Sequence, residues 1–124
     1  MIIADDHPVV LIGTRISLST LINPTTCITH EASTPETLIQ PLEQEPCDLV
    51  FTDFFMPSED FPDGLALISY TRRNFPHVKL LVMTMMKNPM ILRQLLKLGV
   101  TGLLDKHSPA EEFKSAMRAA IQGR

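Results

Sequence analysis

The stretch from Cys47 to Asp53, "CDLVFTD", decides the fold. Its centre, Leu49 to Phe51, is continuously apolar, which is typical of a strand covered by helices on both faces. The stretch ends in aspartate, a residue that is depleted in strands. It therefore predicts a buried strand of a parallel sheet, with Asp53 at the carboxyl end, the edge where ligands bind in such sheets.

Strand patterns and helical patterns alternate along the whole chain. The predicted strands are Met1–Ala4, Ile28–Ala32, Asp48–Thr52, Val78–Thr84 and Val100–Leu104. Helix-start signals follow each of them, with Pro in the first turn or a capping hydroxyl, carboxylate or amide before it. These signals lie after Pro8 and at Ser33-Thr34-Pro35-Glu36, Asp63-Gly64, Asn88-Pro89 and Ser108-Pro109-Ala110-Glu111, with Gly99 closing the fourth helix. Five β-α pairs predict a flavodoxin-like (βα)5 three-layer sandwich with the parallel strand order 2-1-3-4-5.

Two of these helices have an apolar face at helical spacing. In the helix after Pro8 the face is expected at Val9, Ile12 and Ile16, widened by Leu11, Leu18 and Ile22. In the last helix it is expected at Phe113, Met117 and Ala120-Ile121.

Composition indicates one ordinary globular domain. The chain has 124 residues, of which 44% are hydrophobic and 20% charged, and a net charge of −3. Nothing in this charge favours nucleic acid, whose recognition needs a basic face. Cys27 and Cys47 stand apart from any metal-binding motif and are expected to be reduced thiols. No membrane span or signal peptide is evident, so we expect a cytoplasmic location and no membrane partner.

Aspartates also follow the first strand, in "IIADDHP", residues 2–8. In the predicted order the first and third strands are neighbours, about 4.8 Å apart, so Asp5, Asp6 and Asp53 converge. At about 5 Å and an effective dielectric near 20, each close pair repels by ~3 kcal/mol. A hard divalent cation bound through oxygens relieves this repulsion, and Mg²⁺ suits such a site.

The fourth and fifth strands end in residues that complete a phosphate site. "KLLVMT" ends in Thr84 and "GLLDK" ends in Lys106. Lys106 lies two strand spacings from Asp53, roughly 10 Å, within reach of its long side chain. A carboxylate nucleophile, a metal, a hydroxyl and an ammonium together form a phosphoryl-acceptor site.

This set, with Met56-Pro57 after Asp53, resembles the response-regulator receiver domain of two-component signalling. "DDHPVV" and "DGLALI" are similar to the branch whose output is a LuxR/NarL-type helix-turn-helix. The resemblance implies that Asp53 accepts phosphate from a sensor histidine kinase or a phosphotransfer protein. It implies Mg²⁺ bound by Asp6, Asp53 and the main-chain carbonyl of Phe55, with Asp5 acting partly through water. Thr84 would bond a phosphoryl oxygen and Lys106 would pair with it.

The resemblance also implies what phosphorylation does. The domain would be no enzyme beyond self-phosphotransfer and autodephosphorylation. It would switch between two states and dimerise, as a homodimer or with another regulator. Residues 1–124 would form the receiver, and DNA would be bound only by an output domain expected C-terminal to this chain.

Three positions depart from the family's commonest form. Met85 follows the threonine where a small residue is usual, Leu103 replaces a frequent aromatic, and His107 replaces a proline after the lysine. A bulky Met85 would slow phosphotransfer, and Leu103 removes a rotating aromatic switch. A cis Lys106–His107 bond, as proline would favour, would cost about 2.5–4 kcal/mol.

Alternatives remain at this point. Asp6 could cap the first helix, and His7 is interpreted as a local hydrogen-bonding residue, with His30, His77 and His107 on the surface. One functional alternative is a receiver insensitive to phosphate that acts by heterodimerisation. A Mg²⁺-dependent aspartyl phosphohydrolase would need an acid where Phe55 stands, and an FMN carrier would need a phosphate-binding first loop without two aspartates.

Overall fold

The computed structural model describes residues 1–18, 30–85, 88–105 and 110–121 of the chain, and in these residues strands and helices alternate. The elements are β1 (Ile2–Ala4), α1 (Pro8–Leu18), β2 (His30–Ala32), α2 (Pro35–Gln44), β3 (Leu49–Asp53), α3 (Gly64–Asn74), β4 (Lys79–Thr84), α4 (Pro89–Lys97), β5 (Gly102–Asp105) and α5 (Ala110–Ile121). Each predicted strand and helix is present, with boundaries that shift by one or two residues. Residues 28–29 of the second predicted strand lie outside the described part.

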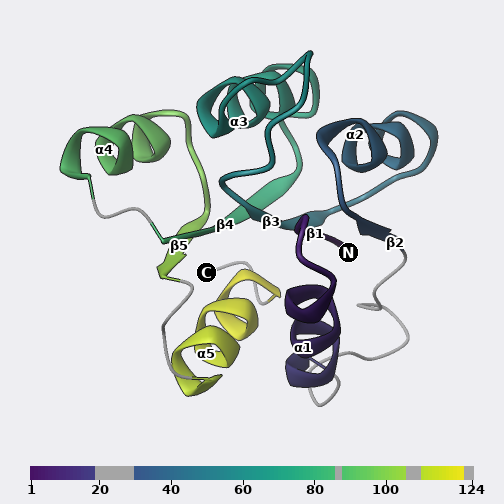
Figure 1. Cartoon of the computed structure of the whole chain (residues 1–124). Coiled ribbons are helices and arrows are strands. Elements are labelled where there is room, and N and C mark those ends of the chain that lie inside the picture. The colour runs from purple at the N-terminus through teal and green to yellow at the C-terminus, as the bar shows by residue number, and fades with distance from the viewer. Residues whose placement is uncertain (19–29, 86–87, 106–109, 122–124) are drawn as a thin grey trace.

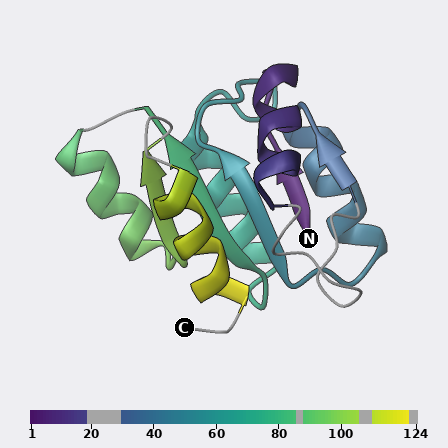
Figure 2. The same cartoon turned by 90° about the horizontal axis from the view of Figure 1, so that it is seen from below.

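The strands form one sheet in the order β2-β1-β3-β4-β5, and all the pairs are parallel. Helices α2, α3 and α4 cover one face, while α1 and α5 cover the other (Figures 1 and 2). The predicted three-layer, flavodoxin-like architecture and its strand order are therefore confirmed.

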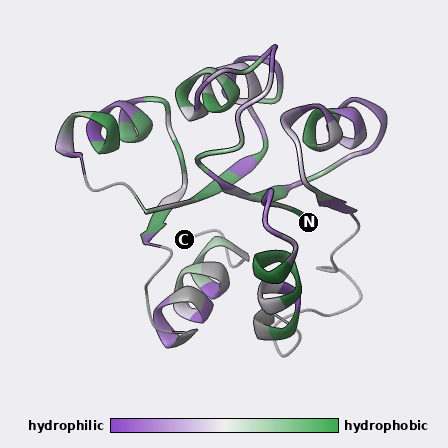
Figure 3. Cartoon of the chain, viewed as in Figure 1, coloured by the Kyte–Doolittle hydropathy of each residue, from purple (hydrophilic) through white to green (hydrophobic). Residues whose placement is uncertain are grey.

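Alternate strand residues build a core on each side of the sheet. Val50 and Leu80 pack toward α2, α3 and α4, whereas Phe51 and Leu81 pack toward α1 and α5. The central strands therefore carry apolar residues on both faces, and Figure 3 colours much of β3 and β4 green, as hydrophobic. Cys47 is buried with a free thiol, and Cys27 lies outside the described residues.

Local capping explains where three helices begin. Thr34 caps α2 in a capping box with Thr37. The Asp63 carboxylate accepts a hydrogen bond from the Ala66 N–H of α3 at 2.8 Å, and the Asn88 side chain accepts one from the Met90 N–H of α4 at 2.9 Å. After α4, Gly99 takes the left-handed φ of +85°, a conformation that a Cβ would disfavour.

Helix α1 corrects one prediction. Val9, Ile12 and Ile16, expected to face the core, are 80%, 60% and 66% exposed. Thr14 is buried instead, and Val10 and Leu11 pack against the core. Because apolar residues lie on both sides of this helix, periodicity alone could not select the buried side. Leu18 and Ile22 cannot be compared, since nothing is described of their side chains.

The strand register fixes which residues meet at the carboxyl edge of the sheet. Ala4 pairs with Thr52, so Asp5 and Asp53 occupy the next positions of neighbouring strands. Asp53 pairs with Met83, and Thr84 pairs with Asp105 at the end of β5. In the described part of the chain, no helix has the length and apolar character to cross a membrane.

Candidate metal and phosphoryl site

Asp5 and Asp53 are buried carboxylates at the ends of β1 and β3. Their residues are only 1% and 3% exposed, although charged side chains are rarely buried without compensation. The main chain holds Asp5 in place, because its N–H donates to the carbonyl of Ala32 at 2.9 Å. The parallel pairing of β1 and β3 therefore brings two acids together at one point of the sheet edge.

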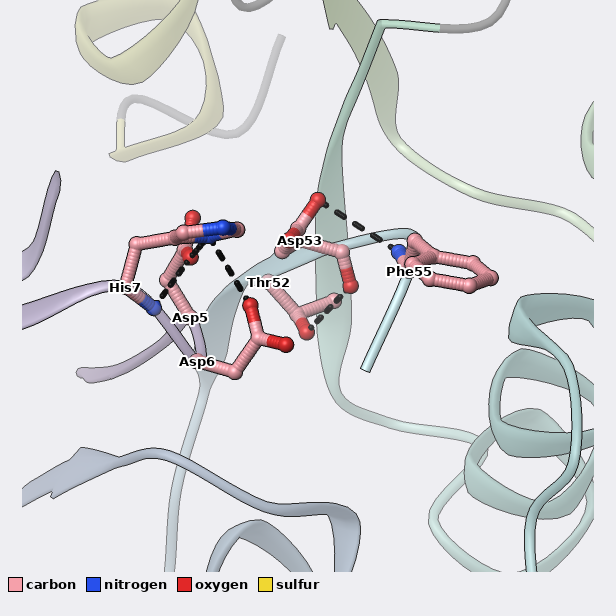
Figure 4. A network of polar contacts seen from close by, with 6 residues as sticks. All are labelled: Asp5, Asp6, His7, Thr52, Asp53 and Phe55. Atoms are coloured by element: carbon pink, nitrogen blue, oxygen red, sulfur yellow. Dashed lines mark hydrogen bonds and ion pairs between the residues drawn. The ribbon is translucent and has the colours of Figure 1, made fainter. Parts of the chain in front are cut away.

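Asp6 and His7 lie above this pair, at the entrance from solvent. The Asp6 side chain is 39% exposed and the His7 side chain 63% exposed. The Nδ1 atom of His7 lies 2.9 Å from Oδ1 of Asp5 and 2.9 Å from Oδ1 of Asp6 (Figure 4). The His7 N–H also donates to Oδ1 of Asp5 at 2.9 Å. The histidine ring thus bridges two carboxylates, as its interpretation as a local hydrogen-bonding residue predicted.

The alternative role for Asp6, as cap of the first helix, does not appear among the described contacts. Helix α1 begins at Pro8, and the carbonyl of His7 accepts hydrogen bonds from the N–H groups of Val10 and Leu11. The carboxylate of Asp6 contacts the His7 ring instead. Asp6 therefore belongs to the acidic cluster rather than to the helix start.

Four side chains here could hold a metal ion. One ligand atom each from Asp5, Asp6, His7 and Asp53 can be chosen so that all four lie within 4.8 Å of one another. Around a small divalent ion with bonds of about 2.1 Å, adjacent ligands lie about 3 Å apart and opposite ligands about 4.2 Å. The donor set therefore suits a divalent cation, and its atoms lie close enough together to face one ion. The cluster of Asp5, Asp6 and Asp53 was predicted, whereas His7 was not recognised as a possible ligand.

The loop after β3 is held by the backbone around Asp53. The N–H of Phe54 donates to the carbonyl of Met83 at 2.7 Å, and the N–H of Phe55 makes a long hydrogen bond of 3.4 Å to Oδ1 of Asp53. Phe54 is buried and Phe55 is 59% exposed. Gly64 permits this arrangement, since a Cβ there would stand 2.1 Å from the carbonyl oxygen of Phe54.

Thr84 lies at the end of β4, beside the strand that carries Asp53. It is buried, while Met85, the next residue, is 62% exposed. Leu103, on β5, is partly buried and packs against the core on the α2–α4 side. Lys106 and His107 lie outside the described residues. The predicted position of Lys106 and the peptide bond between the two residues are therefore not described. The described part thus unites the three aspartates and places Thr84 one strand away.

Comparison with known proteins identifies the family that carries this arrangement. The sequence profile of the response regulator receiver domain matches residues 1–118. The chain belongs to this family. As a receiver domain it is a signalling domain of the two-component type, which decides against the phosphohydrolase and FMN-carrier alternatives.

Individual relatives place this receiver domain in one branch. It is 36% identical to the transcriptional regulatory protein RcsB of Escherichia coli strain K12 over 126 residues, covering 100% of this chain and 56% of RcsB. It is 33% identical to the oxygen regulatory protein NreC of Staphylococcus epidermidis, covering 99% of this chain and 55% of NreC. The chain thus spans about half the length of the curated relatives that it matches. The stretches "IIADDHP", "DGLALI" and "TMMKNPMIL" resemble the capsule-synthesis (Rcs) regulator, and the identity to RcsB confirms this resemblance.

Solved structures agree with this placement. The receiver domain superposes with a TM-score of 0.91 on the isolated REC domain of RcsB from Salmonella enterica serovar Typhimurium, solved with the phosphomimetic BeF3⁻, at 35% identity and covering 99% of this chain and 88% of that one. It superposes with a TM-score of 0.88 on RcsB in a DNA complex, covering 99% of this chain and 60% of that one, at 35% identity. The fold and family therefore rest on both sequence and structure.

Proposed function

We propose that this receiver domain accepts a phosphoryl group on Asp53 from a sensor histidine kinase or a phosphotransfer protein, with Mg²⁺ as cofactor. The observation that carries the proposal is the burial of Asp53 at the end of β3, within a cluster of ligand atoms no more than 4.8 Å apart. Asp6 and Asp53 would bind the ion directly with the main-chain carbonyl of Phe55, and Asp5 partly through water. When bound, Mg²⁺ neutralises charge on the phosphoryl oxygens.

Three residues of the chain would each have a separate role in the transfer of the phosphoryl group. A carboxylate oxygen of Asp53 attacks phosphorus, a P–O bond forms, and the P–N bond to the donor histidine breaks. The hydroxyl of Thr84, at the neighbouring strand end, donates to a phosphoryl oxygen, and the ammonium of Lys106 pairs with another. Water later hydrolyses the acyl phosphate and returns the free carboxylate, so the domain acts on itself and turns over no external substrate.

Phosphorylation would control assembly and transcription. RcsB is described in complexes with DNA and as dimers on two parallel DNAs. We infer that this chain also forms a homodimer or a heterodimer with another regulator, and that a C-terminal helix-turn-helix binds DNA. The exposed apolar stripe of α1, which consists of Val9, Ile12 and Ile16, offers surface that a partner chain could bury.

The test uses Asp53→Asn, which keeps the shape of the side chain but removes the nucleophile. We expect labelling by acetyl phosphate in Mg²⁺, and binding of beryllofluoride, to fall to background. Intact mass spectrometry measures the labelling. Asp48→Asn is the matched control, because Asp48 is an exposed aspartate before the other end of β3, and it should label like the wild type.

Labelling of the Asp53→Asn protein at the wild-type level would refute phosphoryl acceptance at this residue. The solution mass of the same samples, with and without beryllofluoride and Mg²⁺, tests the coupling to assembly. An increase toward the dimer only in the wild type supports phosphorylation-dependent control. Binding of beryllofluoride with an unchanged mass would favour the phosphate-insensitive alternative.

A further inference from the structure

We propose that the groove between α2 and α3 binds a linear aliphatic polyamine. Its volume is about 490 Å³, within the range of about 300–1,000 Å³ that small-ligand sites occupy. Figure 1 shows the two helices side by side on one face of the sheet, and the loop that precedes α3 completes the groove. The lining residues that carry the argument are Ile39, Phe61, Tyr70, Glu36, Glu43 and Asp60. None of them belongs to the acidic cluster, so the inference does not depend on the proposed function.

The apolar part of the groove combines an aliphatic side chain with two aromatic rings. Ile39 of α2 is buried, Phe61 of the loop is half-buried, and Tyr70 of α3 is 36% exposed. The rings of Phe61 and Tyr70 meet edge to face, with centroids 5.3 Å apart and an interplanar angle of 77°. Aromatic rings attract ammonium groups at their faces, and methylene groups gain from apolar contact. This surface therefore suits a ligand in which alkyl segments alternate with cations.

The polar part of the groove carries three carboxylates. Glu36 and Glu43 lie seven residues apart on α2, about 10 Å along the helix axis, and Asp60 stands on the loop. No lysine, arginine or histidine is among the described residues that line the groove. Within the described part of the chain, no cationic side chain forms an ion pair with any of the three acids. Their negative charge is therefore available to a cationic ligand.

The arrangement distinguishes among cationic ligands. One metal ion needs ligand atoms about 3 Å apart, and the metal-type cluster found among the described residues includes none of the groove carboxylates. A basic peptide would bring backbone carbonyls that need donors, and the described lining offers only the amide of Gln40 and the hydroxyl of Tyr70 as side-chain donors. A polyamine has only N–H donors and methylene groups. It therefore matches carboxylate acceptors that are spaced along an apolar surface.

Hydrogen bonds hold the loop side of the groove in place. The hydroxyl of Ser58 donates to Oε2 of Glu36 at 2.8 Å and so joins the loop to α2. The N–H of Ser58 donates to the carbonyl of Phe61 at 2.9 Å, and the N–H of Phe61 donates to Oγ of Ser58 at 3.2 Å. The groove is therefore formed before a ligand binds, and binding requires little ordering of the protein.

The test follows the backbone amide signals of the ¹⁵N-labelled chain by NMR while spermidine is added at constant ionic strength and saturating Mg²⁺. Spermidine carries three ammonium groups separated by alkyl segments, and Mg²⁺ keeps the acidic cluster from competing for it. We expect saturable shifts at Ile39, Gln40 and Phe61. Glu43→Gln should lower the affinity about fivefold, as for the loss of one exposed ion pair. Tyr70→Leu should lower it about threefold, because this variant loses a ring face but keeps an apolar side chain.

Glu111→Gln is the matched control for charge. Glu111 is an exposed glutamate in the first turn of α5, on the other face of the sheet. Its removal changes the net charge as Glu43→Gln does but leaves the groove intact, so the affinity for spermidine should stay at the wild-type level. An equal loss of affinity in the two variants would overturn the proposal, because attraction to net charge alone would then explain the binding.

A second titration tests the kind of occupant. Tri-lysine with an acetylated amino end and an amidated carboxyl end carries the same three positive charges on a peptide backbone, and we expect it to bind the groove more weakly than spermidine. Equal or tighter binding of tri-lysine would overturn the assignment to a polyamine. So would spermidine shifts that do not saturate or that are centred on Asp5 and Asp53. Labelling of Asp53 enters none of these measurements, so failure of the proposed function would leave them unchanged.

Discussion

The two edges of the sheet are built on opposite electrostatic principles. At the carboxyl edge, Asp5, Asp6 and Asp53 bring like charges together. At the amino edge, the guanidinium of Arg72 is surrounded by acceptors, and it donates to the carbonyls of Leu98, Pro76 and Val78 at 3.2, 3.2 and 2.8 Å (all three contacts are hydrogen bonds). One edge therefore gathers negative charge where a cation can bind, whereas the other places a cation among acceptors.

This contrast separates stability from function within one sheet. The three bonds of Arg72 join α3, the end of α4 and the segment that enters β4, so they attract in the absence of any ligand. The aspartates repel one another, by up to about 3 kcal/mol for a close pair at an effective dielectric near 20. Because repulsion among the aspartates lowers the stability of the fold, the hydrogen bonds of Arg72 at the other edge offset part of that loss. Variants at the two edges should consequently fail in different ways.

The largest effect on folding is expected at the amino edge. Arg72→Ala removes three charge-assisted hydrogen bonds and should lower the free energy of unfolding by about 2–3 kcal/mol, since one hydrogen bond to a charged group contributes about 1.5–3 kcal/mol and these three are partly exposed to solvent. Urea denaturation measures this loss. Labelling of Asp53 per folded molecule should stay at the wild-type level, because the site lies at the other edge.

Arg73→Ala is the matched control for this variant. Arg73 is the next residue of α3 and is exposed, so its removal should change the free energy of unfolding by less than about 0.5 kcal/mol. If Arg72→Ala is as stable as Arg73→Ala, the hydrogen bonds of Arg72 at the amino edge do not contribute to the stability of the fold.

A smaller effect of opposite sign is expected at the carboxyl edge. Asp6→Asn removes one of the converging negative charges and should raise the free energy of unfolding by about 1 kcal/mol without metal, since the exposure of Asp6 screens the larger pairwise value. With saturating Mg²⁺ the order should reverse, because the wild type binds the ion better. Urea denaturation in chelator and in Mg²⁺ measures both.

The control for Asp6 is Asp48→Asn, which removes a charge of the same sign outside the cluster and should leave stability nearly equal in both buffers. An Asp6→Asn protein that is less stable than the wild type without metal would mean that the attraction to His7 outweighs the repulsion among the aspartates.

The sequence predicted the architecture because its signals are local. Each signal acts within a few residues: the apolar runs mark strands, and Thr34, Asp63, Asn88 and Gly99 mark helix ends. The alternation of strands and helices along the chain then implies the strand order. The acidic cluster followed from that order. The prediction of the buried face of α1 was wrong because both sides of this helix are apolar. Only tertiary packing could determine which side is buried.

Other features depend on side-chain conformations that a sequence does not encode locally. His7 reaches Asp6 and Asp5 only through the orientation of its ring, although its place directly after two aspartates was a signal that could have suggested a ligand. The bonds of Arg72 join segments up to 26 residues apart. Nothing in the local pattern distinguishes Arg72 from Arg73.

The carboxyl edge consists of the aspartate cluster on one side and of Thr84 and Met85 on the other. A variant of Met85 tests whether its side chain limits the access of a phosphoryl donor to Asp53. Met85 is 62% exposed and directly follows Thr84, where the family usually has a small residue. Met85→Ala should raise the initial rate of labelling by acetyl phosphate about threefold, a decrease of ~0.7 kcal/mol in the barrier. Met90→Ala removes another exposed methionine, from the first turn of α4, and should leave the rate unchanged. A rate that is equal or lower in Met85→Ala would show that the thioether does not obstruct the donor, and that the aspartate half of the edge alone governs the reaction.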